Sequence, residues 1–527
     1  MWTPGFIKDS AMGWMTLVDK RGKIVGNMKI GRIGRWVRDK LRWSLKEELP
    51  LELPEIPPVW KRRPGDRIFR VARVSPWRIP LPIIPRPRHA GLSPVILIYG
   101  FAGVIILGMI LLVLPVSSKA GGFTSPVNAL FTAASAVCVT GLAVVDTGTY
   151  WSGFGQGVIL VLIQLGGLGF MASATLLLLL LGRRLGIRER WLIGQSFGLE
   201  RMGGMVKLVR RILIFTFIVE AIGALIFYIR FSVENPTGTA AWRAVFQSVS
   251  AFNNCGLDLF GNFRSLLNYQ TDTTVILTTA ALIILGGISF MVVADVINVR
   301  RFGRLLLDSK IVLVTTLGLL VLGTVVILIT EYGNAATLGP MSVPYKLLNA
   351  FFQSVTPRTA GFSTINIGGM ETYSQFFTIL LMFVGGAAGS TAGGIKVNTF
   401  GMLVATIWST IRGNEHAGAF GREFSNQQIH RALALVMLAL TLIFIVVLVL
   451  TITEKFGFLN LLFETVSAFG TVGLSTGITS DLSVAGKLII TAVMFVGRLG
   501  PLILVLSLTQ RQQPSAYRYP QDEVRIG

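Results

Sequence analysis

The sequence predicts an all-α membrane protein in which eight transmembrane helices form four repeats of one span–pore helix–span unit. Composition is the first reason: 52% of the 527 residues are hydrophobic and only 14% are charged, which is too apolar for a soluble protein of this length. The second reason is that eight stretches reach the roughly 20 apolar residues that cross a hydrocarbon core. The third is a motif that recurs in four of the loops.

The eight predicted spans divide the chain into repeats. They cover residues 92–115, 157–181, 211–232, 274–296, 311–330, 376–400, 431–452 and 486–508. Helices are expected because a backbone in lipid must satisfy its polar groups internally. The resulting order is a basic, Pro-rich cytoplasmic N-terminal region (1–91), repeats at 92–182, 207–296, 309–400 and 429–508, and a C-terminal tail (509–527).

The positive charge predicts the orientation of the chain. The net charge is +22, and the first 91 residues hold 20 Lys or Arg against 8 Asp or Glu. Further arginine clusters follow spans two, four, six and eight. Because cytoplasmic loops carry such an excess, we expect a multi-pass protein of the cell membrane with both termini in the cytoplasm. We interpret the charge as orientation and contact with anionic lipid, not nucleic-acid binding.

Residue patterns typical of enzymes and metal sites are scarce. Two cysteines make no disulfide framework, the three histidines lie outside the predicted spans, and the first 25 residues hold no signal peptide. The run VGGAAGSTAGGIK (384–396) is rich in glycine and ends on lysine, yet Ile395 separates Gly394 from Lys396, so the phosphate-loop spacing fails. We expect no enzyme and no cofactor on this chain.

Four loops share one motif, and the spans after them share a second. The loops read ALFTAASAVCVTGL (129–142), AVFQSVSAFNNCGL (244–257), AFFQSVTPRTAGF (350–362) and LLFETVSAFGTVGLSTG (461–477). Phe and Gly are ten residues apart in the first, second and fourth copies and nine apart in the third. The following spans contain LGGLGFM (165–171), LGGISFM (285–291), MFVGGAAG (382–389) and MFVGRLG (494–500). The chain therefore contains an internal repeat.

Each loop segment is too short and too polar to cross the bilayer, so it is expected to re-enter the membrane. Irregular backbone at membrane depth is tolerated only in protein or beside a water-filled cavity. A short helix followed by extended backbone ending at glycine places bare carbonyl groups on a pore axis, where they replace the hydration shell of a cation. The negative end of the helix dipole would face the ion. The pattern predicts a pore for a monovalent cation.

At this point the chain resembles the superfamily of K⁺ transporters that includes bacterial Trk and Ktr proteins and plant HKT proteins. The resemblance covers all four repeats, and its most specific marks are SAVCVTGL (135–142), FQSVTPRTAGF (352–362), GSTAGGIK (389–396) and VGRLGP (496–501). It implies four units around one pseudo-fourfold pore, as in the ion-translocating Ktr membrane subunit. The N-terminal extension is longer than that pattern.

The resemblance also implies which residues hold the ion and which proteins assemble with the chain. The selectivity-filter carbonyls, which would bind K⁺, are those of Val139, Thr140, Gly141, Asn254, Cys255, Gly256, Thr359, Ala360, Gly361, Thr471, Val472 and Gly473. Gly141 points to K⁺, because members that prefer Na⁺ often carry serine there. A homodimer and a cytoplasmic ring of nucleotide-binding regulatory subunits are implied, with any nucleotide on that partner.

Two breaks in the repeat predict a gate. Arg498 stands where the other copies have a second glycine, and a charge inside a span is by default functional; the alternative is a structural arginine that caps helix carbonyls. Only the third copy continues from its glycine pair into small residues, which predicts an unwound, movable segment. The predicted gate comprises Gly385, Gly386, Gly389, Ser390, Thr391, Gly393, Gly394, Lys396 and Arg498. Lys396 is either a gate residue or a lysine that snorkels to the interface.

Five residues have weaker assignments. Asp258 follows the second filter glycine and is predicted to attract cations at the outer mouth, or else to pair with Arg264 or solvent. Glu464 is expected to brace the fourth pore helix by a hydrogen bond, and Glu220 to make an interhelical one. Both cysteines, within filter segments, are interpreted as small packing residues.

The function predicted from these features is K⁺ uptake through a carbonyl-lined filter, driven by the membrane potential. Two alternatives stay open: a Na⁺ or Na⁺-coupled cation transporter, and a secondary transporter of another class. Secondary transporters usually contain two repeats of opposite topology, whereas these four run in the same direction.

Overall fold

The structure is a computed structural model, and it describes residues 5–8, 14–18, 24–29, 95–169, 205–414 and 416–500. The chain divides into two compact units, Met1–Ile84 and Pro85–Gly527. The predicted second span of repeat one beyond residue 169, the basic cluster that follows it, the last span beyond residue 500 and the tail lie outside the described residues.

The first unit corrects the all-helical prediction. Three strands, β1 (Gly5–Lys8), β2 (Trp14–Val18) and β3 (Ile24–Lys29), form an antiparallel sheet in the order β1-β2-β3. Each strand pairs with the next along the chain, so short connections suffice to build the sheet. The chain is therefore mostly helical, with a small sheet near its start.

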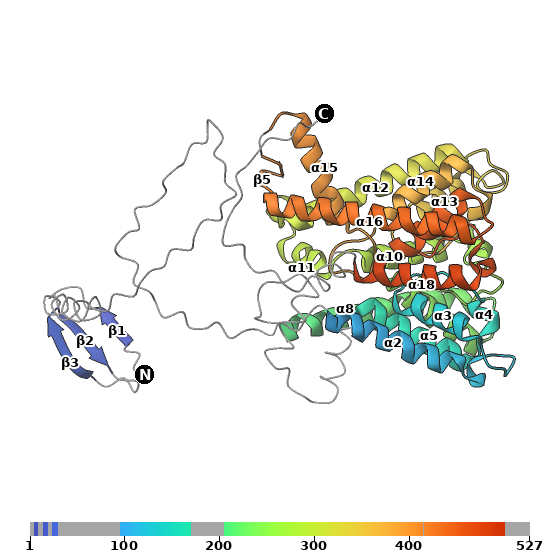
Figure 1. Cartoon of the computed structure of the whole chain (residues 1–527), viewed down its shortest axis with the longest axis horizontal. Helices are drawn as coiled ribbons and strands as arrows, with labels where there is room; N and C mark the ends of the chain where they lie inside the picture. The colour runs from blue at the N-terminus through green and yellow to red at the C-terminus, as the bar shows by residue number, and fades with distance from the viewer. Residues whose placement is uncertain are drawn as a thin grey trace, which may run out of the picture. The chain divides into compact units, whose positions relative to one another are not determined.

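The second unit is a bundle of helices (Figure 1). The first repeat contributes α2 (Val95–Val113), α3 (Pro126–Val137), α4 (Thr147–Tyr150) and α5 (Gly153–Leu168); the second α8 (Met205–Phe231), α9 (Thr237–Phe252), α10 (Thr273–Gly287) and α11 (Phe290–Val299); the third α12 (Leu307–Glu331), α13 (Val343–Val355), α14 (Thr372–Phe383) and α15 (Val397–Ile411); the fourth α16 (Asn426–Thr453), α17 (Phe458–Gly470) and α18 (Val484–Leu499). A two-stranded hairpin, β4 (Gly418–Ala419) and β5 (Arg422–Glu423), precedes α16. Short 3₁₀ turns lie in the connections.

Helix ends follow from local sequence. A capping box begins α16, in which Ser425 accepts the N–H of Gln428 and the Gln428 side chain accepts the N–H of Ser425. Asp272 caps α10 and Ser483 caps α18 through their side chains. The caps fix where each helix enters the bundle.

Three helices are long and apolar enough to cross a membrane by themselves. They are Val209–Phe231 within α8, α12 and α16, and the bent pair α10 and α11 makes a fourth if counted as one span. The other apolar helices of the described bundle are shorter, at 10–17 residues. The described part of the chain thus contains three or four helices of membrane-spanning length and composition, and helix length alone does not yield eight spans within it.

The predicted continuous span at 274–296 is wrong. Its two halves, α10 and α11, meet at an angle of 94°, and Ser289 begins the second half by accepting the N–H of Met291. The break frees the carbonyls of Gly286 and Gly287, which accept the N–H groups of Thr391 and Ala387 from the third repeat. The helix ends here because another segment satisfies its last carbonyls.

The same position ends the second helix of the other repeats. α5 ends at Leu168 before Gly169 (φ +81°), and α18 ends at Leu499 before Gly500 (φ +86°). In the third repeat, residues 384–396 between α14 and α15 are not helical. A helix end therefore recurs at this position in all four repeats, whereas the sequence predicted it in the third repeat alone.

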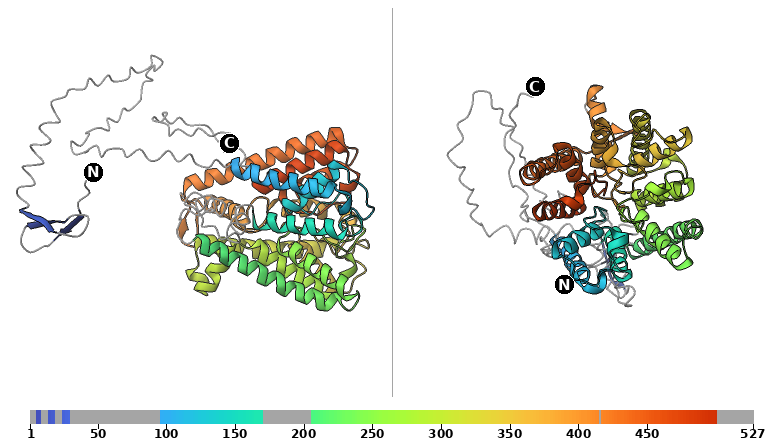
Figure 2. Two further views of the ribbon diagram at one scale, coloured as in Figure 1. Left: turned by 90° about the horizontal axis from the view of Figure 1, so that it is seen from below. Right: turned by 90° about the vertical axis from the view of Figure 1, so that its right-hand side faces the viewer.

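The four repeats close into a ring through their packing. In each, the second helix contacts the short helix of the next repeat: α5 with α9, α10 with α13, α14 with α17, and α18 with α3. The end-on view of Figure 2 shows helices of all four repeats around a common centre. The ends of the four short helices meet at that centre.

Candidate ion pathway

Four loop glycines form a closed ring. A Cβ atom added to Gly141 would lie 2.1 Å from the carbonyl oxygen of Cys255 and 3.2 Å from Cα of Gly256. The same close approach runs from Gly256 to Gly361, from Gly361 to Gly473 and from Gly473 back to Gly141. Each glycine therefore faces the carbonyl of the residue that precedes the next glycine. Glycine fits here because a side chain would collide with the neighbouring backbone.

The backbone before each glycine repeats an unusual conformation. Two residues before the glycine, a residue with a side chain has positive φ, and the glycine itself has positive φ, while the residue between them does not. These φ values are 56° and 89° for Val139 and Gly141, 58° and 85° for Asn254 and Gly256, 69° and 74° for Thr359 and Gly361, and 51° and 94° for Thr471 and Gly473. Alternating φ sign lets successive carbonyls face the same side. Such strained positions cluster at functional sites.

Hydroxyl groups at the ends of the short helices hold these segments. Ser135 accepts the N–H of Gly141 at 3.0 Å, and Ser467 accepts that of Gly473 at 3.1 Å. Ser250 donates to the carbonyl of Leu257, and Thr356 to that of Phe362, both at 2.6 Å. The sequence interpretation missed this group, although the aligned loops place serine six residues before the glycine in copies one, two and four.

A hollow of about 220 Å³ opens beyond the ring, on the C-terminal side of each glycine. All four ring glycines line it, together with Asp146 and Asp258. The two acids have different contacts. Asp146 accepts the N–H of Thr149 and that of Phe263, and so joins the loops of repeats one and two. Asp258 accepts only the N–H of Phe260, at 2.9 Å, among the described contacts. Asp258 thus lies at the mouth without the suggested Arg264 partner in the described part.

Asp258 is expected to make ion entry depend on pH. Desolvation of its carboxyl raises its pKa from 3.8 to about 7, the N–H of Phe260 opposes the rise, and Asp146 adds to it. The group is charged above that pKa and neutral below it. Initial Rb⁺ uptake at subsaturating Rb⁺ should fall about two- to fivefold between outer pH 8 and pH 6, because one nearby charge contributes about 0.5–1 kcal/mol.

Asp258→Asn should keep the low uptake at both pH values. Glu371→Gln, which neutralises an exposed acid at the start of α14, is the matched control and should retain the full pH response. An Asp258→Asn variant with the wild-type pH profile would show that this carboxyl is not the titrating group.

The Gly-rich segment 384–396 lies on the opposite side of the ring from the mouth. Val384 pairs with Ile395, and Gly385 donates to the Ile395 carbonyl at 2.8 Å, so the segment closes on itself. Thr391 is fully buried. Its hydroxyl lies 2.9 Å from the carbonyl of Gly286 and 3.3 Å from Oδ1 of Asn254, a predicted filter residue. The segment therefore touches both a broken helix and the filter.

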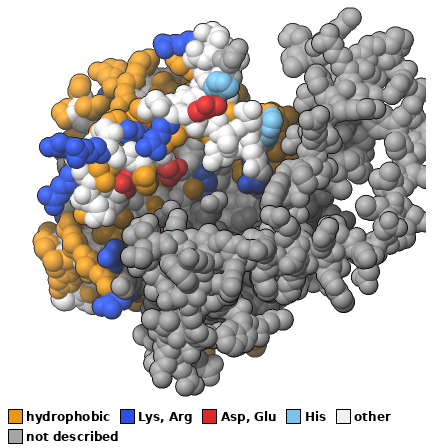
Figure 3. All heavy atoms as spheres, turned by 90° about the vertical axis from the view of Figure 1, so that its left-hand side faces the viewer, with side chains coloured by type: hydrophobic (Ala, Val, Ile, Leu, Met, Phe, Trp, Pro, Cys, Tyr) orange, Lys and Arg blue, Asp and Glu red, His pale blue; other side chains and the backbone are white. Residues whose placement is uncertain are grey.

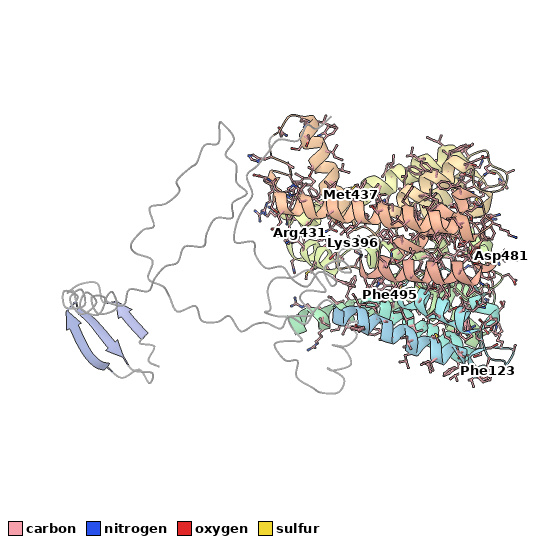
Figure 4. All side chains as sticks on the ribbon, in the orientation of Figure 1. Phe123, Lys396, Arg431, Met437, Asp481 and Phe495 are labelled. Atoms are coloured by element: carbon pink, nitrogen blue, oxygen red, sulfur yellow. The ribbon has the colours of Figure 1, made fainter. Side chains whose placement is uncertain are left out.

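Two cations hold this segment. The Arg498 guanidinium donates to the carbonyls of Thr391 in the segment and Gly166 in the first repeat, and lies 3.4 Å from that of Gly167. Lys396 Nζ donates to the carbonyl of Ala392 at 2.6 Å. The lysine turns back onto its own segment and does not extend toward an interface. Figure 4 shows Lys396 between Arg431 toward one end of the bundle and Asp481 at the other.

The remaining predicted gate residues belong to the same segment, 384–396, and are closely packed. A Cβ on Gly385 would meet the Gly393 carbonyl, one on Gly386 the Gly287 carbonyl, and one on Gly394 the backbone of Gly470. Gly389 is the member at the edge, near Ser289, and Ser390 donates to the Ala387 carbonyl. The segment is packed against repeats two and four.

The weaker assignments also have places in the structure. Glu464 is fully buried and accepts from the Thr479 hydroxyl, so it joins the fourth short helix to a mouth loop. Cys138 and Cys255 are buried and free. Figure 3 shows Lys and Arg side chains on the described surface at the end opposite the mouth. Exposed Arg301, Arg422 and Arg431 belong to that end.

Four strained glycine segments form a ring among membrane-type helices, with an arginine-held loop on one side, an arrangement that fits a cation transport protein. The chain belongs to the family of the TrkH cation transport protein, whose model matches residues 95–518. It is 43% identical to Ktr system potassium uptake protein B of Bacillus subtilis, covering 82% of this chain and 96% of that protein. It is 40% identical to potassium/sodium uptake protein NtpJ of Enterococcus hirae, covering 83% and 98%.

A solved structure shows the same fold. The potassium transporter TrkH from Vibrio parahaemolyticus superposes with a TM-score of 0.63 at 17% identity, covering 82% of this chain and 88% of that chain. These relatives are transport proteins and not enzymes.

Proposed function

We propose that this protein carries K⁺ into the cell through the ring of Gly141, Gly256, Gly361 and Gly473, as the membrane subunit of a Ktr-type system. The single observation that carries the proposal is the ring itself, in which four segments present the same alternating backbone around one centre. Backbone carbonyls so arranged replace the water of a monovalent cation. Two relatives named Ktr system potassium uptake protein B, from Bacillus subtilis and Vibrio alginolyticus, support K⁺ as the cargo.

Ion movement requires no covalent chemistry on this chain. The ion enters at the mouth beside Asp258, sheds water in the filter and then meets the segment 384–396 and Arg498. The membrane potential supplies the driving force, about 2.3 kcal/mol per charge per 100 mV. A positive charge beside a cation path opposes passage, so the contact between Arg498 and Thr391 supports a closed gate formed by both.

The proposal includes eight spans with pseudo-fourfold symmetry and both termini in the cytoplasm. The cyclic packing of each second helix on the next short helix supports the symmetry. The exposed arginines at the end opposite the mouth support the orientation. A homodimer and a cytoplasmic regulatory subunit that binds a nucleotide follow from the similarity to Ktr system proteins.

Na⁺ transport is the second candidate. The relative named as a potassium/sodium uptake protein favours it, as do the unlike residues that flank the four glycines. Eight of the predicted filter residues are not glycine. Among the described hydrogen bonds, only Asn254 of these eight reaches the next filter loop through its side chain, which donates to the carbonyl of Arg358, the residue before Thr359. Unlike flanks make equal ion sites harder to build than four identical ones.

Ion uptake into proteoliposomes tests the proposal. Proteoliposomes that contain the purified protein and are loaded with K⁺ should accumulate ⁸⁶Rb⁺ when their interior is electrically negative. Excess K⁺ outside the vesicles should suppress this uptake more strongly than the same concentration of Na⁺. Protein-free vesicles are the control. Accumulation of ²²Na⁺ in preference to ⁸⁶Rb⁺ would replace K⁺ by Na⁺ as cargo, and accumulation of neither by the protein with its cytoplasmic partner would refute the proposal.

A further inference from the structure

Three polar side chains form a closed triangle between repeats one and two. Glu220 of α8 accepts from Asn253 Nδ2 at 3.0 Å through one carboxyl oxygen and from Gln164 Nε2 at 3.3 Å through the other. Gln164 of α5 in turn accepts from Asn253 Nδ2 at 2.9 Å. Glu220 is 5% exposed and Asn253 is fully buried. The triangle joins two helices to the residue that ends the second short helix.

The triangle lies in apolar surroundings, where a lost hydrogen bond finds no other partner. The adjoining groove, about 380 Å³ in volume, is otherwise lined by apolar residues including Leu160, Phe217 and Val245. Hydrocarbon offers no hydrogen bonds to a polar group that loses its partner. A buried acid in a span is costly and is expected to have a role.

Asn253 connects the triangle to the filter. The next residue, Asn254, has φ +58° and begins the second filter segment. Asn254 Nδ2 donates to the Arg358 carbonyl of the third repeat at 3.2 Å. Asn253 also fits against Gly167, where an added Cβ would lie 1.9 Å from its Oδ1. A strained residue keeps its conformation only when its surroundings fix it, and these contacts fix both sides of Asn254.

In the described parts of the other three repeats this arrangement is absent. The position three residues before the ring glycine is Asn253 in the second copy and Cys138, Arg358 and Gly470 in the others. Ser354 donates to Leu320 in the third repeat as Ser248 donates to Glu220 in the second, so Leu320 occupies the place of Glu220. The acid is therefore a feature of the second copy and not of the repeat.

We propose that Glu220 is a positioning residue for ion selectivity: its carboxyl group holds Asn253, and thereby fixes the second filter segment at the geometry that favours K⁺ over Na⁺. This inference rests on the proposed function. Glu220 does not touch the ion. It acts because both of its oxygens accept, so the two amides that face it are each oriented by it.

The arrangement of donors and acceptors predicts which variants lose a hydrogen bond and which variant restores all three. In Glu220→Gln, the NH₂ group of the new amide faces either Gln164 Nε2 or Asn253 Nδ2, and both of these are donors. Two donors cannot bond to each other, so at least one of the three hydrogen bonds is lost. Rotating Gln164 restores one bond but removes its oxygen from Asn253. In Glu220→Gln with Gln164→Glu, the carboxyl group moves across the interface and all three bonds form again with the roles exchanged.

The measurement is the ratio of initial ⁸⁶Rb⁺ to ²²Na⁺ uptake by the full chain in proteoliposomes. Glu220→Gln should lower this ratio about three- to tenfold, a loss that matches one buried hydrogen bond. Asn253→Ser, which leaves Glu220 and Gln164 in contact, should lower it similarly. The double exchange should return the ratio to within about twofold of wild type. Glu331→Gln, a fully buried acid bonded to Thr337 and Asn334 away from the filter, should leave the ratio unchanged.

The outcomes separate this inference from the function on which it rests. Wild-type protein that accumulates neither ion when its cytoplasmic partner is present refutes the proposed function. Wild-type Rb⁺ uptake together with an unchanged ratio in Glu220→Gln and Asn253→Ser overturns the positioning role alone. An exchanged pair that keeps the low ratio also overturns it, because the bonds would then be present without their effect.

Discussion

Replacing Gly141 by serine is expected to lower the Rb⁺ to Na⁺ uptake ratio by about tenfold or more. Gly141 has φ +89°, a conformation that side chains rarely adopt, and its added Cβ would lie 2.1 Å from the Cys255 carbonyl oxygen. That oxygen belongs to the next filter segment, so it must move away from its place in the ring. Strain of about 1–3 kcal/mol per residue in such positions is enough to change the spacing on which selectivity depends.

The control for this variant is Gly121→Ser. Gly121 also has positive φ (+67°), in a loop of the same repeat, but an added Cβ there would meet nothing within 4 Å. Both variants therefore add the same atoms at a strained backbone, and only one of them faces a filter carbonyl. Equal ratios in Gly141→Ser and wild type, with matched protein in the vesicles, would remove Gly141 from the filter.

The sequence predicted the long helices well, because their apolar length is a local property. α12 was expected at 311–330 and α16 at 431–452, and both exceed these bounds by only a few residues. The four loop glycines that the repeat singled out lie in one ring. Their similar spacing from a phenylalanine, ten residues in three copies and nine in the third, carried this information, since similar spacing along equivalent helices places the glycines at equivalent points in space.

The break between α10 and α11 was missed for a physical reason. The residues LGGISFMVVADVI (285–297) are mostly apolar, with Ser289 and Asp295 as the polar exceptions, a pattern that suits a continuous helix. What ends α10 is a tertiary contact: Thr391 and Ala387, a hundred residues later, donate to the freed carbonyls of Gly286 and Gly287. A helix end that depends on a distant donor leaves little trace in the local sequence.

The buried polar contacts were missed for a related reason. Glu220 is the only acidic residue in its predicted span (211–232), and the sequence suggested only some interhelical bond. Its partners, Gln164 and Asn253, lie 56 and 33 residues away along the chain and belong to different helices. Such sites become visible only when the packing of one repeat on the next is known.

Arg498→Ala is expected to raise Rb⁺ uptake by about tenfold in the absence of the cytoplasmic partner. The guanidinium donates to carbonyls of Thr391 in the gate segment and Gly166 in the first repeat, and so ties the segment across the pore. Hydrogen bonds from a charged group contribute about 1.5–3 kcal/mol, which would shift a closed–open equilibrium at least tenfold. Removing the charge also lowers the barrier to a cation on the same path.

The variant Thr391→Val tests whether the segment 384–396 and Arg498 form one gate or two independent gates. Its isosteric side chain loses the hydroxyl contacts to Gly286 and Asn254 but leaves the backbone carbonyl that Arg498 binds. If the segment and the arginine form one gate, the double variant Thr391→Val with Arg498→Ala should take up Rb⁺ only slightly faster than Arg498→Ala alone, because losing Arg498 has already released the segment. Arg422→Ala, at an exposed position of the hairpin, controls for the loss of positive charge. If the fold-increase in Rb⁺ uptake of the double variant equals the product of the two single-variant increases, the two residues act as separate barriers in series.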